Sequence, residues 1–200
     1  MMKSVLISIQ PKFCELIANG EKTIEVRKTR PKIETPFKCY IYETKGKTLY
    51  WSQPFPIPYY EGKGKVIGEF ICDKIIEYPY MTDGYSSSYG YLNITRDGLI
   101  MMHLEHSELE TYGDGKTLYG WHISDLVIYD EPKKITKFMK PCDKDDFPCE
   151  LCENVGFAID NIREEKDSKN RIVRKGTYRM ICANWVKKAP QSWCYVDELK

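Results

Sequence analysis

Residues 20–28 (GEKTIEVRK) hold the side chains best suited to gripping a charged or polar ligand. In a strand, successive side chains alternate between two faces, so Ile24 and Val26 would enter a core and leave the polar side chains opposite. We predict ligand contacts from this polar face, with Lys22 at its mouth. Thr23, Glu25 and Arg27 line this face, and Lys22 and Lys28 are also predicted to contact the ligand. A solvated strand face with a Glu-Arg surface pair is the alternative interpretation.

The chemistry of this set is first of all that of binding. Arg27 and Lys22 could hold a phosphate, and Glu25 could accept a hydrogen bond from an exocyclic amine such as that of cytosine. In a dry cleft, Arg27 would disfavour the ammonium form of Lys22 and favour an amine that acts as a base or nucleophile, whereas Glu25 would oppose this. We therefore favour binding over catalysis.

Trp121 and His122 are neighbours in a second β-rich run, residues 119–129. Adjacent residues of a strand face opposite ways, so one of the two belongs to the core. We include Trp121 among the ligand-binding residues, because an aromatic ring at a cleft can stack on a base for about 1–3 kcal/mol; burial in a core is the equal alternative. His122 has no second histidine nearby, so we assign it no catalytic role.

The elements that would position these residues are short. Residues 5–9 form an apolar, β-rich run, and the helix after it would begin at Pro11 and end at Gly20. The capping-box pattern of Ser107 and Glu110 predicts a second helix that ends near Gly113. Further strands are expected at 37–43, 64–76 with a bend at Gly68, 119–129 with a stop at Glu131-Pro132, 171–174, 178–182 and 190–196. Short strands with two short helices predict an α+β fold, a small mixed β-barrel.

Three stretches interrupt this pattern and are predicted to be insertions. Residues 44–63 contain a proline-rich run that cannot lie inside a sheet, residues 79–106 are rich in serine and tyrosine, and residues 140–170 are acidic with a turn near 167–170. Two hundred residues fit one domain, 1–200, decorated by these insertions.

The net charge of +1 hides an uneven distribution of charge. Residues 1–50 carry ten Lys/Arg against five Asp/Glu, residues 51–150 carry ten against seventeen, and residues 151–200 carry ten against seven. A basic patch built from the two ends could therefore meet phosphate. No apolar run approaches the roughly 20 residues of a membrane span, and no secretory signal is evident, so we expect a cytoplasmic protein of a bacterium or phage.

The eight cysteines indicate reduced thiols in an intracellular chain rather than a disulfide framework. Cys142, Cys149 and Cys152 are the candidates for a metal site. Structural zinc usually needs four ligands and a second close pair, so we expect no bound metal and no cofactor.

Five stretches together resemble one known family. They are 7–12, 20–28, Gly68-Glu69-Phe70, Tyr119-Gly120-Trp121-His122-Ile123 and Pro190-Gln191-Ser192-Trp193-Cys194-Tyr195. Over residues 3–138 and again at its end, the chain resembles the ASCH domain, a relative of the PUA and EVE/YTH groups. The resemblance implies a PUA-like β-barrel flanked by short helices, with a cleft beside the charged strand for RNA or a modified nucleoside.

One bacterial branch of that family is an amidohydrolase that deacetylates N4-acetylcytidine with a Lys, a Thr and a Glu, and another member is assigned ribonuclease activity. The Lys falls on Lys22, the Thr on Glu25, and the Glu within 105–110. We therefore predict an ASCH protein that binds RNA or a modified nucleoside. The alternative is an amidohydrolase that uses Lys22 and Glu25, or a ribonuclease.

Overall fold

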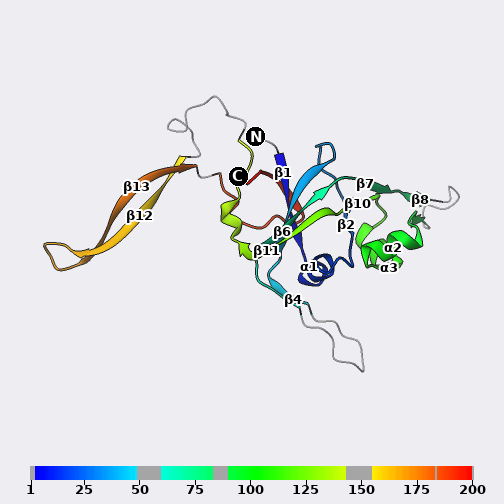
Figure 1. Cartoon of the computed structure of the whole chain (residues 1–200), viewed down its shortest axis with the longest axis horizontal. Helices are drawn as coiled ribbons and strands as arrows, with labels where there is room; N and C mark the ends of the chain where they lie inside the picture. Colours follow the sequence, from blue (N-terminus) through cyan, green and yellow to red (C-terminus); the bar gives the residue numbers. More distant parts are fainter. Residues whose placement is uncertain (1–2, 49–59, 83–89, 143–154, 183, 200) are drawn as a thin grey trace, which may run out of the picture.

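The computed structural model describes residues 3–48, 60–82, 90–142, 155–182 and 184–199. Its larger sheet has five strands in the order β11-β6-β3-β1-β14 (Figure 1). Their bounds are β1 (Lys3–Ile9), β3 (Phe37–Glu43), β6 (Val66–Cys72), β11 (Ser124–Lys133) and β14 (Trp193–Asp197). Strands β1 and β3 pair in parallel, because the chain between them crosses over through a helix and a strand of the second sheet.

The second sheet has three strands in the order β2-β10-β7. Their bounds are β2 (Ile24–Arg27), β7 (Ile75–Tyr78) and β10 (Leu118–His122). Strand β6 leads into β7, β10 leads into β11, and these two chain segments pair in both sheets, so one long ribbon joins the sheets. At the junction the His122 N–H donates to the Lys74 carbonyl at 2.9 Å.

Two expected single strands are therefore each divided between the sheets. The run 64–76 becomes β6 and β7, and the run 119–129 becomes part of β10 and β11. The bend at Gly68 is real, because the strand pairing shifts register beside it, and a side chain there would meet the Val127 carbonyl. The expected stop at Pro132 is wrong: β11 continues to Lys133, since an edge strand tolerates proline.

The α+β class is confirmed, whereas closure into a barrel is not. Among the described residues, β11 and β14 are the outer strands of the larger sheet, and they do not pair with each other. The body is thus built on two sheets joined by a shared ribbon.

Three α-helices and one 3-10 turn complete the body. They are α1 (Pro11–Ala18), α2 (Arg96–Met102), α3 (His106–Gly113) and η1 (Ile135–Lys137). Helix α1 begins at Pro11, and Gly20 follows its end with a φ of 76°, as predicted. Helix α3 ends at Gly113 as predicted, but its capping box joins Glu105 and Glu108 instead of Ser107 and Glu110. None of the helices described is long and apolar enough to cross a membrane.

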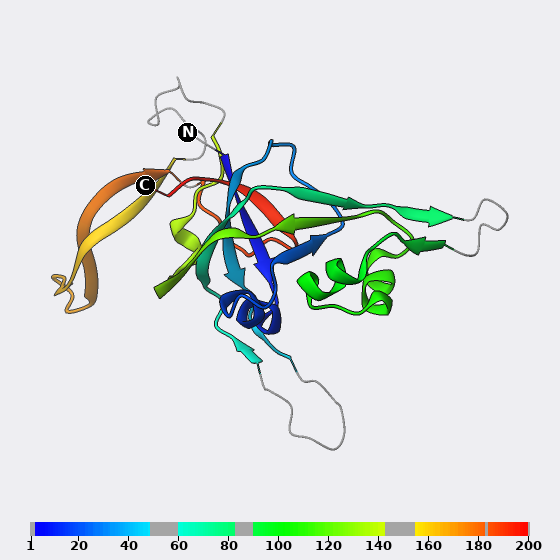
Figure 2. The same ribbon diagram turned by 45° about the vertical axis from the view of Figure 1, so that its right-hand side comes forward.

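The three predicted insertions contain strand pairs in their described parts. They are β4 (Gly46–Thr48) with β5 (Tyr60–Gly62), β8 (Tyr80–Thr82) with β9 (Gly90–Leu92), and β12 (Val155–Lys166) with β13 (Ile172–Cys182). The stretch 79–106 is more than a loop, because its Leu92 and Met102 are buried with Ile24 and Val26. The expected turn at 167–170 joins β12 to β13, so this hairpin continues beyond residue 170. It projects from the side of the body opposite α2 and α3 (Figures 1 and 2).

Candidate functional site

A cavity of about 200 Å³ lies where β1, α1, β2 and α3 meet. Three of its lining residues, Lys22, Glu25 and Arg27, were predicted from the sequence. They reach it because β1 ends at Ile9, α1 begins two residues later, and the return from α1 leads directly into β2. The remaining lining residues are Ser8, Ile9, Gln10, Phe13, Val26, Leu104, Glu108 and Tyr112.

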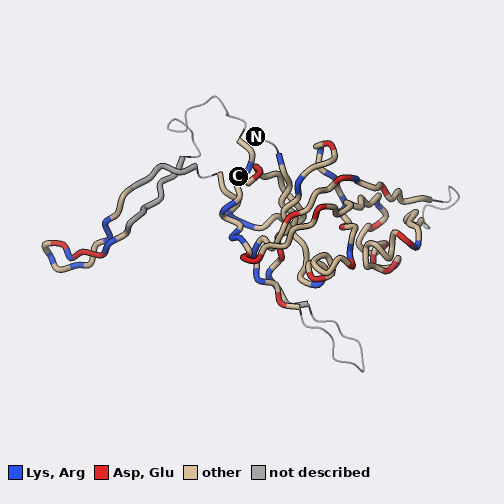
Figure 3. The backbone as a smooth tube through the Cα atoms, in the orientation of Figure 1, with Lys and Arg blue, Asp and Glu red and all other residues tan. Residues whose placement is uncertain are grey.

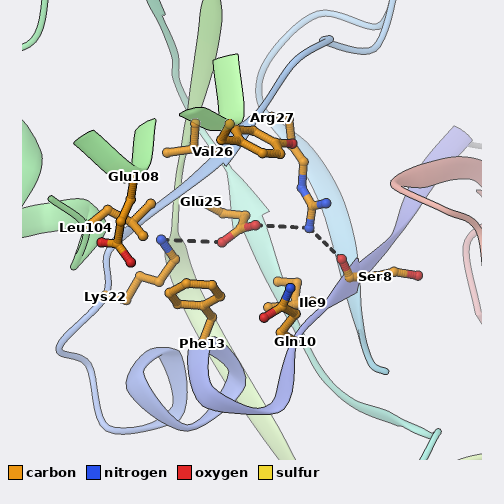
Figure 4. A pocket seen from close by; sticks show the side chains of 11 residues that line it. Ser8, Ile9, Gln10, Phe13, Lys22, Glu25, Val26, Arg27, Leu104 and Glu108 are labelled. Atoms are coloured by element: carbon orange, nitrogen blue, oxygen red, sulfur yellow. Dashed lines mark hydrogen bonds and ion pairs between the residues drawn. The ribbon is translucent and has the colours of Figure 1, made fainter. Parts of the chain in front are cut away.

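Glu25 lies between the two cations (Figure 4). One of its carboxylate oxygens is 2.9 Å from a terminal nitrogen of Arg27, and the other is 3.5 Å from Nζ of Lys22. A carboxylate can accept about four hydrogen bonds, so Glu25 keeps capacity for a ligand donor. The three side chains form a donor-acceptor-donor row in the lining of the cavity.

Backbone carbonyls from two other segments fix the cations of this row, and a third segment holds one of those two. Lys22 Nζ donates to the carbonyl of Met102, the last residue of α2, at 2.6 Å, where a helix end leaves carbonyls without partners. Arg27 donates to the Ser8 carbonyl at 2.6 Å. Ser8 itself is held by the closing segment, because its hydroxyl donates to the Pro190 carbonyl at 2.7 Å. The geometry of the row therefore depends on α2, β1 and the end of the chain together.

The row is buried, which corrects two expectations. Lys22 is 2% exposed and lies inside the site rather than at its mouth. The alternative of a solvated surface pair is wrong, because the side chains of Glu25 and Arg27 are only 8% and 9% exposed. Alternation along β2 did place Ile24 and Val26 in a core, but β1, α1 and α3 enclose the side chains of Glu25 and Arg27 as well.

Burial lowers the pKa of Lys22, and the neighbouring Glu25 opposes this shift. The ammonium also lies 5.0 Å from the centre of the Phe13 ring, a cation-π contact. Burial raises the pKa of Tyr112, and the neighbouring Arg27 opposes this shift. The site thus holds a buried lysine whose charged form is disfavoured by burial and favoured by the adjacent counterion Glu25.

Arg27 carries one polar group that the protein leaves unused. Its Nε is buried and has no hydrogen-bond partner in the described structure. Buried donors are nearly always paired, so an unpaired one needs an explanation such as a water or a ligand. The core residue Trp121 has an unpaired buried Nε1 as well, so this feature of Arg27 does not by itself indicate a ligand.

The other predicted ligand residues lie outside the cavity lining. Thr23 is half-buried, and its backbone bonds Met101 and Ile123. Lys28 is exposed, with Nζ 5.0 Å from the centre of the Tyr112 ring. Lys28 therefore borders the site through Tyr112, whereas Thr23 joins β2 to its neighbours.

Trp121 lies in the core, which corrects its assignment to the ligand site. It is 0% exposed and packs between Phe37 and Trp193, with ring centres 5.8 and 5.9 Å away. A ring enclosed in this way offers no face to a base. Its neighbour His122 is half-buried, shares a 2.7 Å hydrogen bond with Asp73 and does not line the cavity.

Sequence reasoning missed the aromatic part of the site. Phe13 falls on the inner face of the predicted helix, which gave a signal, whereas Tyr112 and Gln10 carried none. Glu108 is the carboxylate within 105–110 that lines the cavity; it also accepts from the Glu105 N–H at 2.8 Å. These residues reach the cavity from other elements, so β2 alone could not reveal them.

The cysteine hypothesis remains a prediction. Cys142 is half-buried, while Cys149 and Cys152 lie outside the described residues. In the described part of the chain, no three side chains of the metal-binding types gather.

Comparison with known proteins gives a structural likeness only. No family model matches the chain, and no curated protein matches it significantly. Among solved structures, the ASCH protein of Zymomonas mobilis is 20% identical with a TM-score of 0.44, over 66% of this chain and 73% of that one. Two mutant forms of it are 18% and 19% identical, each with a TM-score of 0.45, over 67% and 66% of this chain and 77% and 73% of theirs. These structures are ASCH domains, the family that the sequence motifs resemble.

Proposed function

We propose that the cavity binds one base of an RNA or of a modified nucleoside. The observation that carries this proposal is the buried row of Lys22, Glu25 and Arg27 beside two aromatic rings. A nucleobase has two flat apolar faces and a polar edge, and proteins read an extruded base by stacking on its faces and hydrogen bonding to its edge.

The size of the cavity supports a base rather than a larger ligand. Sites for drug-sized ligands span about 300–1,000 Å³, whereas this one measures about 200 Å³. A single base would fill it, and the sugar would lie toward the rim. Phe13 and Tyr112 supply apolar surface for the faces of the base.

The polar row supports a preference for bases that carry an exocyclic amine. Glu25 is an acceptor for such an amine, and the guanidinium of Arg27, which lines the cavity, supplies N–H donors for a ring nitrogen or carbonyl. Cytosine offers an amine beside a ring nitrogen and a carbonyl, whereas uracil replaces the amine by an oxygen that Glu25 would repel. We therefore expect cytidine and its derivatives to bind about 5- to 150-fold more tightly than uridine, because a buried acceptor left without its donor costs about 1–3 kcal/mol.

Calorimetric titration with cytidine, N4-acetylcytidine, uridine and short RNAs tests the proposal. Gln10→Trp should block the cavity, because Gln10 is exposed, lines it, and makes no side-chain cap bond to α1. Ala18→Trp is the matched control, exposed on the same helix but outside the lining. Absence of binding at millimolar nucleoside and RNA, or equal binding by both variants, would refute the proposal.

The amidohydrolase is the second candidate, and one observation favours it. The lowered pKa of Lys22 makes its free amine more accessible near neutral pH, as a base or nucleophile requires. Incubation with N4-acetylcytidine should then release acetate and cytidine, and Lys22→Met should stop the release. A binding module would return the nucleoside unchanged, and shortened RNA fragments on a gel would indicate the ribonuclease instead.

A further inference from the structure

Five exposed lysines gather on a part of the surface that is distinct from the cavity. Residues 137–140 and 184–186 run side by side: the Val186 N–H donates to the Phe138 carbonyl at 2.7 Å, and the Lys140 N–H to the Asn184 carbonyl at 2.9 Å. This pairing brings together two groups of lysines that are far apart in the sequence. The lysine patch consists of Lys134, Lys137, Lys140, Lys187 and Lys188. None of the five lines the cavity.

The charges of the lysine patch are not neutralised by the described protein. None of its five side chains takes part in an ion pair there, and none has a hydrogen bond of its own. On the neighbouring end of the chain, Glu198 is already engaged by Lys38 at 2.8 Å. Asp197 borders the patch, because its backbone N–H donates to the Met139 carbonyl at 2.9 Å.

The lysine patch is not a by-product of a basic chain. The net charge of the whole chain is +1, so a group of five exposed lysines without counterions is a local concentration of charge. Such a concentration raises the local potential and attracts a polyanion. In Figure 3, segments coloured for Lys and Arg lie on the side of the body from which the hairpin projects.

The hairpin β12–β13 extends the same positive surface. Residues 162–177 carry six Lys/Arg against three Asp/Glu. The three acidic side chains pair with Arg171, Arg174 and Lys175, at 2.6, 3.2 and 2.9 Å. Three cations of the hairpin remain without such a partner in the described structure: Arg163, Lys166 and Lys169. Strand β13 ends two residues before Asn184, so the hairpin leads directly into the lysine patch.

An aromatic ring lies within this basic surface. Trp185 is half-buried, and Nζ of Lys187 lies 5.8 Å from its ring centre. Sites for single-stranded nucleic acids combine such rings, on which bases stack, with cations that follow the backbone. This combination distinguishes a strand of nucleic acid from an acidic protein surface.

We propose that the lysine patch, extended by the hairpin, binds the phosphate backbone of a nucleic-acid strand. The contacts would be to phosphate and would carry no base identity, in contrast to the cavity. The proposal does not depend on the function of the cavity, because the two surfaces share no residue.

Fluorescence anisotropy with a labelled oligouridine of about 20 nucleotides, at 50 to 200 mM NaCl, tests the proposal. The test variant is Lys137→Gln/Lys187→Gln/Lys188→Gln. Its control is Lys63→Gln/Lys74→Gln/Lys116→Gln, which changes the net charge equally at exposed lysines outside the patch. Each lost phosphate contact lowers the slope of log K against log salt by about 0.7 on a single strand, so the test variant should lose about 2 in slope and at least about tenfold in affinity.

Three further measurements decide the proposal. Arg163→Gln/Lys166→Gln/Lys169→Gln should weaken binding less than the patch variant, and a deoxythymidine oligomer should behave like oligouridine. Equal binding by the patch variant and its control, or no binding at 50 mM NaCl, would overturn the proposal. So would loss of oligouridine binding in Gln10→Trp but not in the patch variant, or binding to phosphatidylserine vesicles without binding to either oligomer.

Discussion

The cavity and the lysine patch place positive charge on this protein under opposite conditions. In the cavity, two cations flank one carboxylate, all three side chains are nearly inaccessible to water, and carbonyls of other segments hold the cations. In the lysine patch, five cations are exposed and have no counterion among the described residues. The buried charges must be compensated within the fold, because an unpaired buried charge costs several kcal/mol, whereas water solvates the exposed ones.

This difference indicates different ligands. A cavity whose cations already have a carboxylate between them gains little from a second anion, and it suits a neutral polar group such as the edge of a base. The lysine patch has no internal anion and gains counterion release from every phosphate that it contacts. The number of Lys and Arg residues in a sequence therefore indicates little about the ligand until it is known which of them are paired with acidic side chains of the same protein.

The largest expected effect is on stability, from removal of the carboxylate in the cavity. Glu25→Ala should lower the free energy of unfolding by about 3–5 kcal/mol, because it leaves Lys22 and Arg27 buried without their counterion. Glu165→Ala, which breaks an exposed pair with Lys175, should cost about 0–1 kcal/mol. Denaturant melts compare the two, and similar costs would mean that the buried row is solvated like the surface.

Salt should separate the two surfaces in binding. Between 50 and 200 mM NaCl, the affinity of the lysine patch for oligouridine should fall on the order of 100-fold if five lysines contact phosphates. Binding of uncharged cytidine by the cavity should change by less than about twofold, because buried interactions are screened little. Equal salt dependence of the two ligands would show that both use the same exposed charges.

The pH dependence of stability should reveal the strain on Lys22. Unfolded Lys22 keeps its proton up to its ordinary pKa of 10.5, whereas the folded protein releases it at lower pH because burial lowers that pKa. Between the two values the unfolded state binds more protons, so stability rises with pH there. Lys22→Met lacks this contribution, and the stability of wild type minus that of Lys22→Met should increase from neutral toward alkaline pH. A difference that does not change with pH would show that Glu25 compensates the burial fully.

The smallest effect is expected from the lysine patch in the absence of ligand. Lys137→Gln/Lys187→Gln/Lys188→Gln should change the free energy of unfolding by no more than about 0.5 kcal/mol per site, since exposed positions without partners contribute little. Thermal melts at low salt measure this. A marked loss of stability would mean that these lysines hold the two segments together and are not reserved for a partner.

Local sequence patterns predicted the charged strand but not the burial of its charged side chains. Alternation in β2 placed Ile24 and Val26 correctly, and the start and end of α1 followed from Pro11 and Gly20. The burial of Lys22 depends on α2, whose Met102 is 80 residues away in the sequence. Such contacts leave no periodic signal near Lys22.

Trp121 and the lysine patch both depend on tertiary contacts that the local sequence does not predict. A large aromatic residue on a strand fits a core or a cleft equally well, and only the neighbouring Phe37 and Trp193 decided for the core. The charge counts along the chain predicted a basic patch from its two ends, whereas the patch found joins Lys134 to Lys188 across a hairpin. Which lysines meet was decided by the pairing of residues 138 and 186.

That pairing also has a consequence for how such a chain can change over generations. The stretch between Lys140 and Asn184 leaves the body and returns to it at adjacent points, joined by one backbone hydrogen bond. The entropic free-energy cost of closing a loop grows by only about 0.6 kcal/mol for each doubling of its length. An insertion at this position can therefore become longer or shorter, or be replaced by another, with little loss of stability in the body. The position is thus one at which an insertion can be acquired during evolution.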